Sequence, residues 1–143
     1  MTDDPTEISL EGMRAWVAGR ISRDQSEVGE DSDLDRDLGI YGDGHGALME
    51  TFAKEFQVDL SGYRWYFHTR EQRHSFGSAF FEPPDEQVSH IPVTPRLLWE
   101  CARKGKWEPG YPAHELPGKR WGLVVNMGII LFFLVYISWQ CMR

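Results

Sequence analysis

An uncharged, apolar stretch constrains the fold of this chain most strongly. Residues 121–142 contain no Asp, Glu, Lys or Arg, and most of their side chains are large and apolar. As a helix that rises about 1.5 Å per residue, this stretch reaches about 33 Å, enough to cross a hydrocarbon core of about 30 Å. Trp121 at one end and Tyr136 and Trp139 at the other are typical of the two membrane interfaces. Residues 121–142 are therefore predicted to form a transmembrane helix.

The distribution of basic residues predicts how this helix is oriented. Lys119 and Arg120 directly precede it, and three more basic residues, at positions 103, 104 and 106, lie within about 20 residues of its start. Only Arg143 follows it. Because positively charged flanks stay in the cytoplasm, we expect a single-pass protein of the cell inner membrane. Its N-terminal domain is expected in the cytoplasm and its C-terminus outside.

Charge and composition divide the rest of the chain. Residues 1–59 hold 15 acidic and 5 basic residues, whereas residues 60–120 hold 7 acidic and 9 basic ones. The acidic half argues against nucleic acid as a partner, because phosphate binding requires clustered Lys and Arg. We predict one small domain over residues 1–107, a Pro- and Gly-rich linker over residues 108–120, and the transmembrane helix over residues 121–142.

The spacing of apolar residues predicts three helices in the domain, over residues 6–21, 44–57 and 94–105. Thr6 and Thr94 are the expected N-caps, and Pro95 suits the first turn of the third helix. Residues 61–93 are rich in aromatic side chains and show no regular period.

A helical wheel divides the second of these helices into two sides. The apolar side carries Leu48, Met49, Phe52 and Phe56, and the opposite side carries Asp43, Glu50 and Lys54. The three charged residues are the candidate partner-facing residues.

The segment 37–60 has a recognisable pattern. It begins Asp-Leu-Gly-Ile-Tyr-Gly-Asp and ends Glu-Phe-Gln-Val-Asp-Leu, with the second predicted helix between these ends. This segment resembles the central part of an acyl carrier protein. With Tyr66-Phe67, Ile-Pro-Val-Thr at 91–94 and Gly-Lys-Trp at 105–107, the chain resembles an uncharacterised bacterial acyl-carrier-protein-like family, a domain of unknown function. The resemblance implies an all-α, small acyl-carrier-like bundle with an irregular aromatic-rich insertion.

The chain departs from an acyl carrier where the carrier chemistry takes place. The residue at the position of the phosphopantetheine-bearing serine is Gly42, which has no hydroxyl to modify. Ser61 lies beyond the end of the helix, and three positions where a carrier has acids hold Ala47, Ala53 and Lys54. We therefore expect the fold without phosphopantetheine or any other cofactor.

Other candidate sites are weaker. Asp31, Asp33 and Asp35 alternate as at the start of a calcium loop, but Arg36 occupies the position of the turn glycine, so a solvated acidic loop is favoured. The glycines at 42, 44 and 46 suggest a phosphate cradle, but neighbouring acids favour a simple turn that starts a helix. The five histidines form no zinc motif, and no serine or cysteine has the setting of a nucleophile. We expect no metal and no catalytic residue.

These features favour a non-enzymatic, membrane-anchored adaptor that binds an unknown protein partner at the cytoplasmic face and contacts lipid through residues 121–142. An acyl carrier or lipid-metabolism accessory protein, modified at a non-standard residue, is the alternative. A small metal-dependent enzyme that uses the acids of residues 31–43 is a third hypothesis. Asn126 either binds a second helix in the membrane or lies near the cytoplasmic interface.

Overall fold

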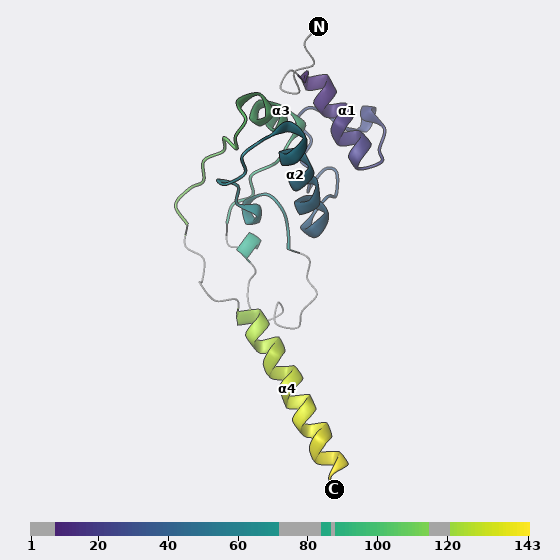
Figure 1. Cartoon of the computed structure of the whole chain (residues 1–143), viewed down its shortest axis with the longest axis vertical. Helices are drawn as coiled ribbons and strands as arrows, with labels where there is room; N and C mark the ends of the chain where they lie inside the picture. Colours follow the sequence, from purple (N-terminus) through teal and green to yellow (C-terminus); the bar gives the residue numbers. More distant parts are fainter. Residues whose placement is uncertain (1–7, 72–83, 87, 115–120) are drawn as a thin grey trace.

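The computed structural model describes residues 8–71, 84–86, 88–114 and 121–143. These residues are mainly helical, as predicted, and contain no β-strand (Figure 1). Three helices, α1, α2 and α3, build the domain, and a fourth, α4, extends away from it. Their bounds are Leu10–Arg20, Gly42–Phe56, Pro95–Lys104 and Trp121–Cys141. Short 3-10 turns, η1, η2 and η4, cover Gln25–Glu27, Trp65–Phe67 and Pro84–Glu86.

Helix α1 begins later than the sequence predicts. Its N-cap is Ser9, whose hydroxyl oxygen accepts a hydrogen bond from the backbone N–H of Gly12 at 3.0 Å. The predicted cap, Thr6, lies outside the described residues. Serine and threonine cap equally well in the sequence pattern, and the apolar period does not distinguish a start at residue 6 from a start at residue 10. The predicted end of the helix, near residue 21, is confirmed.

Helices α2 and α3 follow the predicted pattern closely. The four residues of the predicted apolar side of α2 are buried, and Asp43, Glu50 and Lys54 are exposed. Helix α3 has the predicted cap, because the Thr94 hydroxyl accepts a hydrogen bond from the Leu97 N–H at 3.2 Å. Gly105 ends α3 in the left-handed region with φ of 69°.

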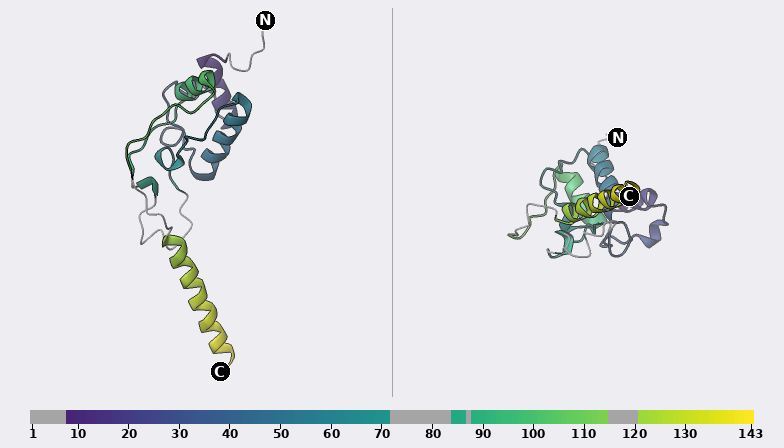
Figure 2. Two further views of the ribbon diagram at one scale, coloured as in Figure 1. Left: turned by 60° about the vertical axis from the view of Figure 1, so that its left-hand side comes forward. Right: turned by 90° about the horizontal axis from the view of Figure 1, so that it is seen from below.

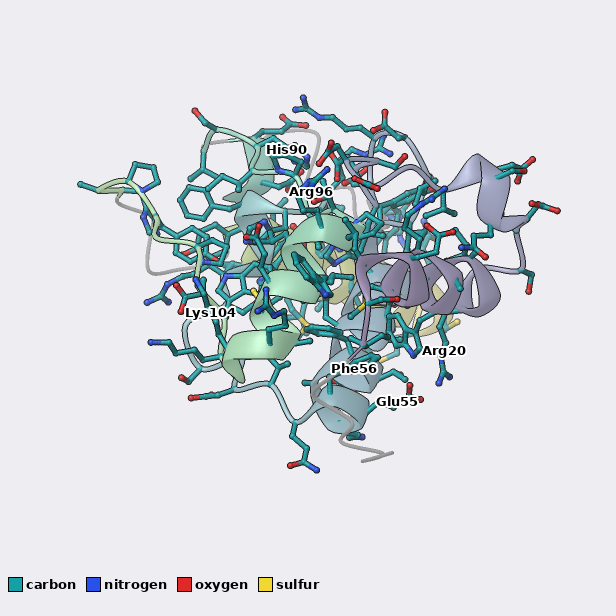
Figure 3. The ribbon with its side chains drawn as sticks, turned by 90° about the horizontal axis from the view of Figure 1, so that it is seen from above. Arg20, Glu55, Phe56, His90, Arg96 and Lys104 are labelled. Carbon is teal, nitrogen blue, oxygen red and sulfur yellow. The ribbon has the colours of Figure 1, made fainter. Side chains whose placement is uncertain are left out.

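The core forms where the apolar sides of α1, α2 and α3 meet, and it includes Met13, Val17, Met49, Phe52, Leu98 and Cys101. Trp16 of α1 packs edge-on against Phe52, with ring centroids 6.0 Å apart. At the rim of the core, Glu55 of α2 accepts hydrogen bonds from the Trp16 indole N–H and from Arg20. Figure 3 shows Arg20 and Glu55 side by side between the two helices. The ion pair fixes the end of α1 against α2.

A second cluster of side chains lies beside α2 and is built from two segments distant in sequence. Residues 61–71 contribute Tyr63, Phe67 and His68, and the stretch after α3 contributes Trp107 and Tyr111. The centroids of Phe67 and Tyr111 are 4.7 Å apart, and those of Tyr63 and Trp107 are 5.1 Å apart. Within the described part of 61–93 only short 3-10 turns occur, and the aromatics at 76, 80 and 81 lie outside it.

Helix α4 is long and apolar enough to cross a membrane. Over Val124–Cys141 its mean hydropathy is 1.8, and none of this window is buried against the rest of the chain. Figure 2 shows α4 extending away from the domain. A helix that is apolar on all sides and uncovered by protein suits a lipid environment.

The core makes a first prediction. Phe52 is fully buried, so Phe52→Ala removes its ring from the contact between α1 and α2 and leaves a cavity. We expect the free energy of unfolding to fall by about 3–5 kcal/mol in chemical denaturation. Lys54→Ala, on the exposed side of the same helix, is the control and should change it by at most about 0.5 kcal/mol. Equal stability of the two variants would contradict the placement of α2.

Candidate functional site

The start of α2 is determined by the backbone of Gly42. This residue has φ of 58°, in the left-handed region that favours glycine. Its N–H donates to the Thr69 hydroxyl at 3.0 Å and to the Arg70 carbonyl at 3.2 Å. The interpretation of the glycines as a turn that starts a helix is thus confirmed for Gly42, whereas Gly44 and Gly46 have ordinary helical backbone. Gly42 therefore forms a structural turn at the start of α2.

The buried carboxylate of Asp35 binds the segment, residues 69–70, that accepts the hydrogen bonds of the Gly42 N–H. Asp35 is 1% exposed, and its two oxygens accept hydrogen bonds from the backbone N–H of Arg70 at 2.7 Å and from its Nε at 2.8 Å. The guanidinium of Arg70 also lies over the ring of Tyr41, 4.8 Å from its centroid. One aspartate thereby fixes both the main chain and the side chain of Arg70.

The expected solvated acidic loop is only partly correct. Asp31 is exposed and pairs with Arg96, but Asp33 and Asp35 are buried and pair with His90 and Arg70. Figure 3 labels two of these basic partners, His90 and Arg96. Each acid therefore has a different basic residue as its partner, and a buried carboxylate needs a hydrogen-bonding partner. No group of three or more metal-ligating side chains occurs among the described residues.

The exposed side of α2 borders a recess of about 670 Å³. One wall is formed by residues of α2: the small residues Gly46 and Ala47 and the acids Asp43 and Glu50. Tyr63 and Trp65 line the other wall. The structure thus brings two of the three candidate partner-facing residues to one recess. Lys54 lies farther along α2 and does not line it.

Sequence reasoning missed the contacts of two buried histidines, His45, which lines this recess, and His68. His45, on the inner side of the first turns of α2, contacts Tyr63 through its Nδ1, 3.2 Å from the hydroxyl. The Tyr63 ring stacks between His45 and His68, with interplanar angles of 9° and 8°. In the sequence, a histidine next to aromatic residues, as at Phe67-His68, was the available signal, and that pattern does not specify which residues are in contact.

His68 belongs to a closed set of hydrogen bonds. Its Nδ1 lies 2.8 Å from the Ile91 carbonyl oxygen, so this nitrogen carries the proton and donates. Its Nε2 then accepts from the Tyr111 hydroxyl at 2.8 Å. The same hydroxyl oxygen accepts from the Arg64 N–H at 3.0 Å and from the Trp107 indole N–H at 2.7 Å. The arrangement requires a neutral His68, and burial lowers its pKa to about 4.

The family described as "Protein of unknown function (DUF1493)" matches residues 10–109. The chain belongs to this family. The match covers helices α1, α2 and α3 together with the recess beside α2, and α4 lies outside it. Among curated proteins and among solved structures, no match was found.

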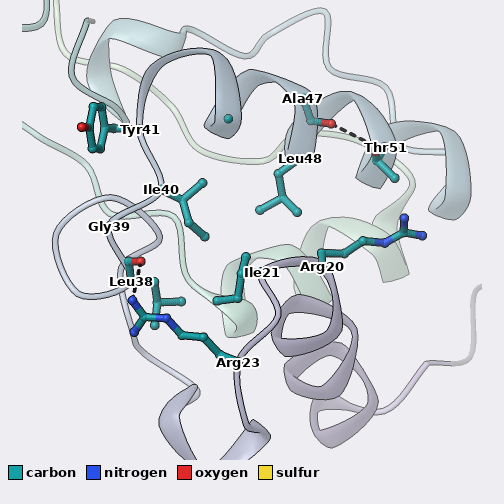
Figure 4. Close-up of a pocket in the computed structure, with 11 residues that line it drawn as sticks. Arg20, Ile21, Arg23, Leu38, Gly39, Ile40, Tyr41, Ala47, Leu48 and Thr51 are labelled. Atoms are coloured by element: carbon teal, nitrogen blue, oxygen red, sulfur yellow. Dashed lines mark hydrogen bonds between the residues drawn. The ribbon is translucent and has the colours of Figure 1, made fainter.

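The DUF1493 domain has a further recess, of about 600 Å³, between the end of α1 and α2 (Figure 4). Ile21, Ile40 and Leu48 point toward its centre. Two arginines border it, but Arg20 is paired with Glu55, and Arg23 donates to the Leu38 carbonyl oxygen at 3.2 Å. Both guanidiniums thus have partners within the domain. The acids on the recess beside α2 differ in this respect, because no ion pair of Asp43 or Glu50 occurs among the described residues.

The buried histidines predict how stability of the DUF1493 domain depends on pH. Burial lowers the pKa of His45 and of His68 from 6.5 to about 4, so below pH 6.5 the unfolded chain binds more protons than the folded one. The free energy of unfolding should therefore be constant above about pH 7 with respect to these groups and should fall between about pH 6.5 and pH 4. Denaturant titrations across this range measure the slope.

The variant His68→Gln separates this effect from other titrations. It keeps a donor and an acceptor but cannot be protonated, so we expect a slope shallower by up to about 1.4 kcal/mol per pH unit near pH 5. His114→Gln, at the edge of the cluster, is the matched control. An unchanged slope in His68→Gln would show that His68 does not titrate as its burial requires.

Proposed function

We propose that this chain is a non-enzymatic, membrane-anchored adaptor that binds a protein partner through the exposed side of α2. The observation that carries the proposal is that this side presents three charged residues, Asp43, Glu50 and Lys54, with no ion pair to other described residues. The acids of the nearby loop, by contrast, are paired within the domain. Charged groups that face water beside a recess are available to a partner.

The proposal places the domain at the cytoplasmic face of an inner membrane. Helix α4 is the anchor, and the basic residues before it support a single pass with the domain on the cytoplasmic side. The likeness of residues 37–60 to an acyl carrier protein supports partner binding through α2, because a carrier presents the equivalent helix to its partners. A fold by itself does not determine a function, so the proposal depends on the surface residues.

Site-specific photocrosslinking in the full-length chain tests this function. With a photoreactive residue at position 50, we expect one defined cross-linked protein, retained in membranes washed with carbonate. Position 100, an exposed acid on α3, is the control and should give no such product. Equal products from both positions, or a cross-linked species in the soluble fraction, would contradict an anchored adaptor that uses α2.

The alternative function, an acyl carrier or lipid-metabolism accessory protein modified at a non-standard residue, makes the opposite prediction about covalent mass. Gly42 offers no hydroxyl, and its φ of 58° makes any larger side chain unfavourable there by about 1 kcal/mol. Intact mass after co-expression with a phosphopantetheinyl transferase should therefore show no gain for the wild-type chain. We expect at most partial gain for Gly42→Ser. Attachment to the wild-type chain at any residue would favour the alternative.

A further inference from the structure

The recess beside α2 has two walls of different chemistry. On the α2 wall, Asp43 and Glu50 present carboxylates across a floor of small residues. The residues that line the recess from outside α2 include Trp65, which is 36% exposed, and Tyr63, which is half-buried. The partly exposed indole thus shares the recess with three acids, Asp43, Glu50 and Glu71. Carboxylates beside an aromatic face form a favourable environment for a cation.

A buried nitrogen at the recess has no partner. His45 lines the recess and is fully buried, and its Nε2 forms no hydrogen bond within the described residues. Its other nitrogen, Nδ1, is bonded to the Tyr63 hydroxyl, so Nε2 is the buried nitrogen at the recess that has no partner in the described part of the chain. Burial keeps the pKa of His45 near 4, and a neutral ring can accept a hydrogen bond through Nε2 when Nδ1 donates to Tyr63.

We propose that this recess takes an arginine side chain of the protein partner. The guanidinium stacks on Trp65 and donates to the carboxylates of Asp43 and Glu50. Arginine fits better than lysine, because its planar group stacks on an aromatic ring and offers five donors in a fixed fork. The surplus of acids over residues 1–59 also favours a basic partner at long range. This inference rests on the proposed docking at α2.

The Trp65 wall gives this inference its specificity. Acids on a helix attract any cation, but an exposed indole opposite them distinguishes a planar cation from an ammonium group. Trp65 comes from η2, in the aromatic-rich segment that the acyl-carrier resemblance does not explain. The second recess, between α1 and α2, has no such combination, since both of its arginines already have partners.

A capped tripeptide, acetyl-Gly-Arg-Gly-amide, tests the inference against the full-length chain in zwitterionic detergent micelles. Its neutral citrulline analogue and its lysine analogue are the matched probes. In ¹⁵N-edited NMR titrations we expect shifts of the Trp65 indole N–H and of the backbone amides of residues 43–50. The arginine peptide should bind more tightly than the lysine peptide, and the citrulline peptide should cause no shift.

Variants locate the binding. Asp43→Asn combined with Glu50→Gln should weaken the arginine peptide about fivefold or more, and Trp65→Leu about threefold. Glu100→Gln, which removes one exposed acid from α3, should leave affinity unchanged. Binding that survives the double variant, or that is equal for citrulline, would overturn the inference. If crosslinking from position 50 succeeds while the arginine peptide fails, the adaptor function stands and the arginine inference falls.

Discussion

The carboxylate of Asp35 determines much of the geometry beside α2. A carboxylate that is 1% exposed is strongly unfavourable without compensation, and here Arg70 supplies both a backbone N–H and a charged side chain. Because the same residue offers its carbonyl to Gly42, the ion pair and the start of α2 form one connected unit. Removing the Arg70 side chain would leave a buried carboxylate without its charged partner, whereas the Arg70 side chain is 61% exposed and would remain solvated without Asp35. The start of α2, which lines the recess, is therefore connected to the Asp35–Arg70 ion pair.

A second anchor connects the aromatic segment to the stretch after α3. The Tyr111 hydroxyl donates to His68 and accepts from two N–H groups, so each of its hydrogen-bonding capacities is used. His45 contrasts with it, because one of its nitrogens is bonded and the other is not. A closed set of hydrogen bonds stabilises the fold and offers nothing to a ligand. The Nε2 of His45, beside the recess, has no hydrogen-bonding partner among the residues that the structure describes, and this distinguishes His45 from His68, both of whose ring nitrogens are bonded.

The sequence predicts features that arise within one helix, but it does not predict contacts between residues distant in the chain. The period of apolar residues predicts α2 and its outward charges, and a threonine followed by proline predicts α3, because each signal lies within one helix. The pairs Asp33–His90 and Asp31–Arg96 join residues far apart in the chain. The alternating acids at 31, 33 and 35 indicate only that charges are present. Asp33 and Asp35 are buried, with partners distant in the sequence that no local pattern predicts. For the same reason, Asp43 and Glu50 were predictable and the wall formed by Trp65 was not.

Gly42 explains why the surface of α2, and not its first residue, is the candidate for function. A left-handed backbone angle and a modified serine are competing demands on one position, since a side chain is disfavoured at φ of 58°. The N–H of Gly42 is also committed to Thr69 and Arg70, which ties this turn to the buried ion pair of Asp35. A prosthetic group attached here would have to displace contacts on which the helix start depends. The same turn begins α2, the helix that brings Asp43 and Glu50 to the recess. Gly42 thus belongs both to a turn that disfavours a side chain and to the lining of the recess.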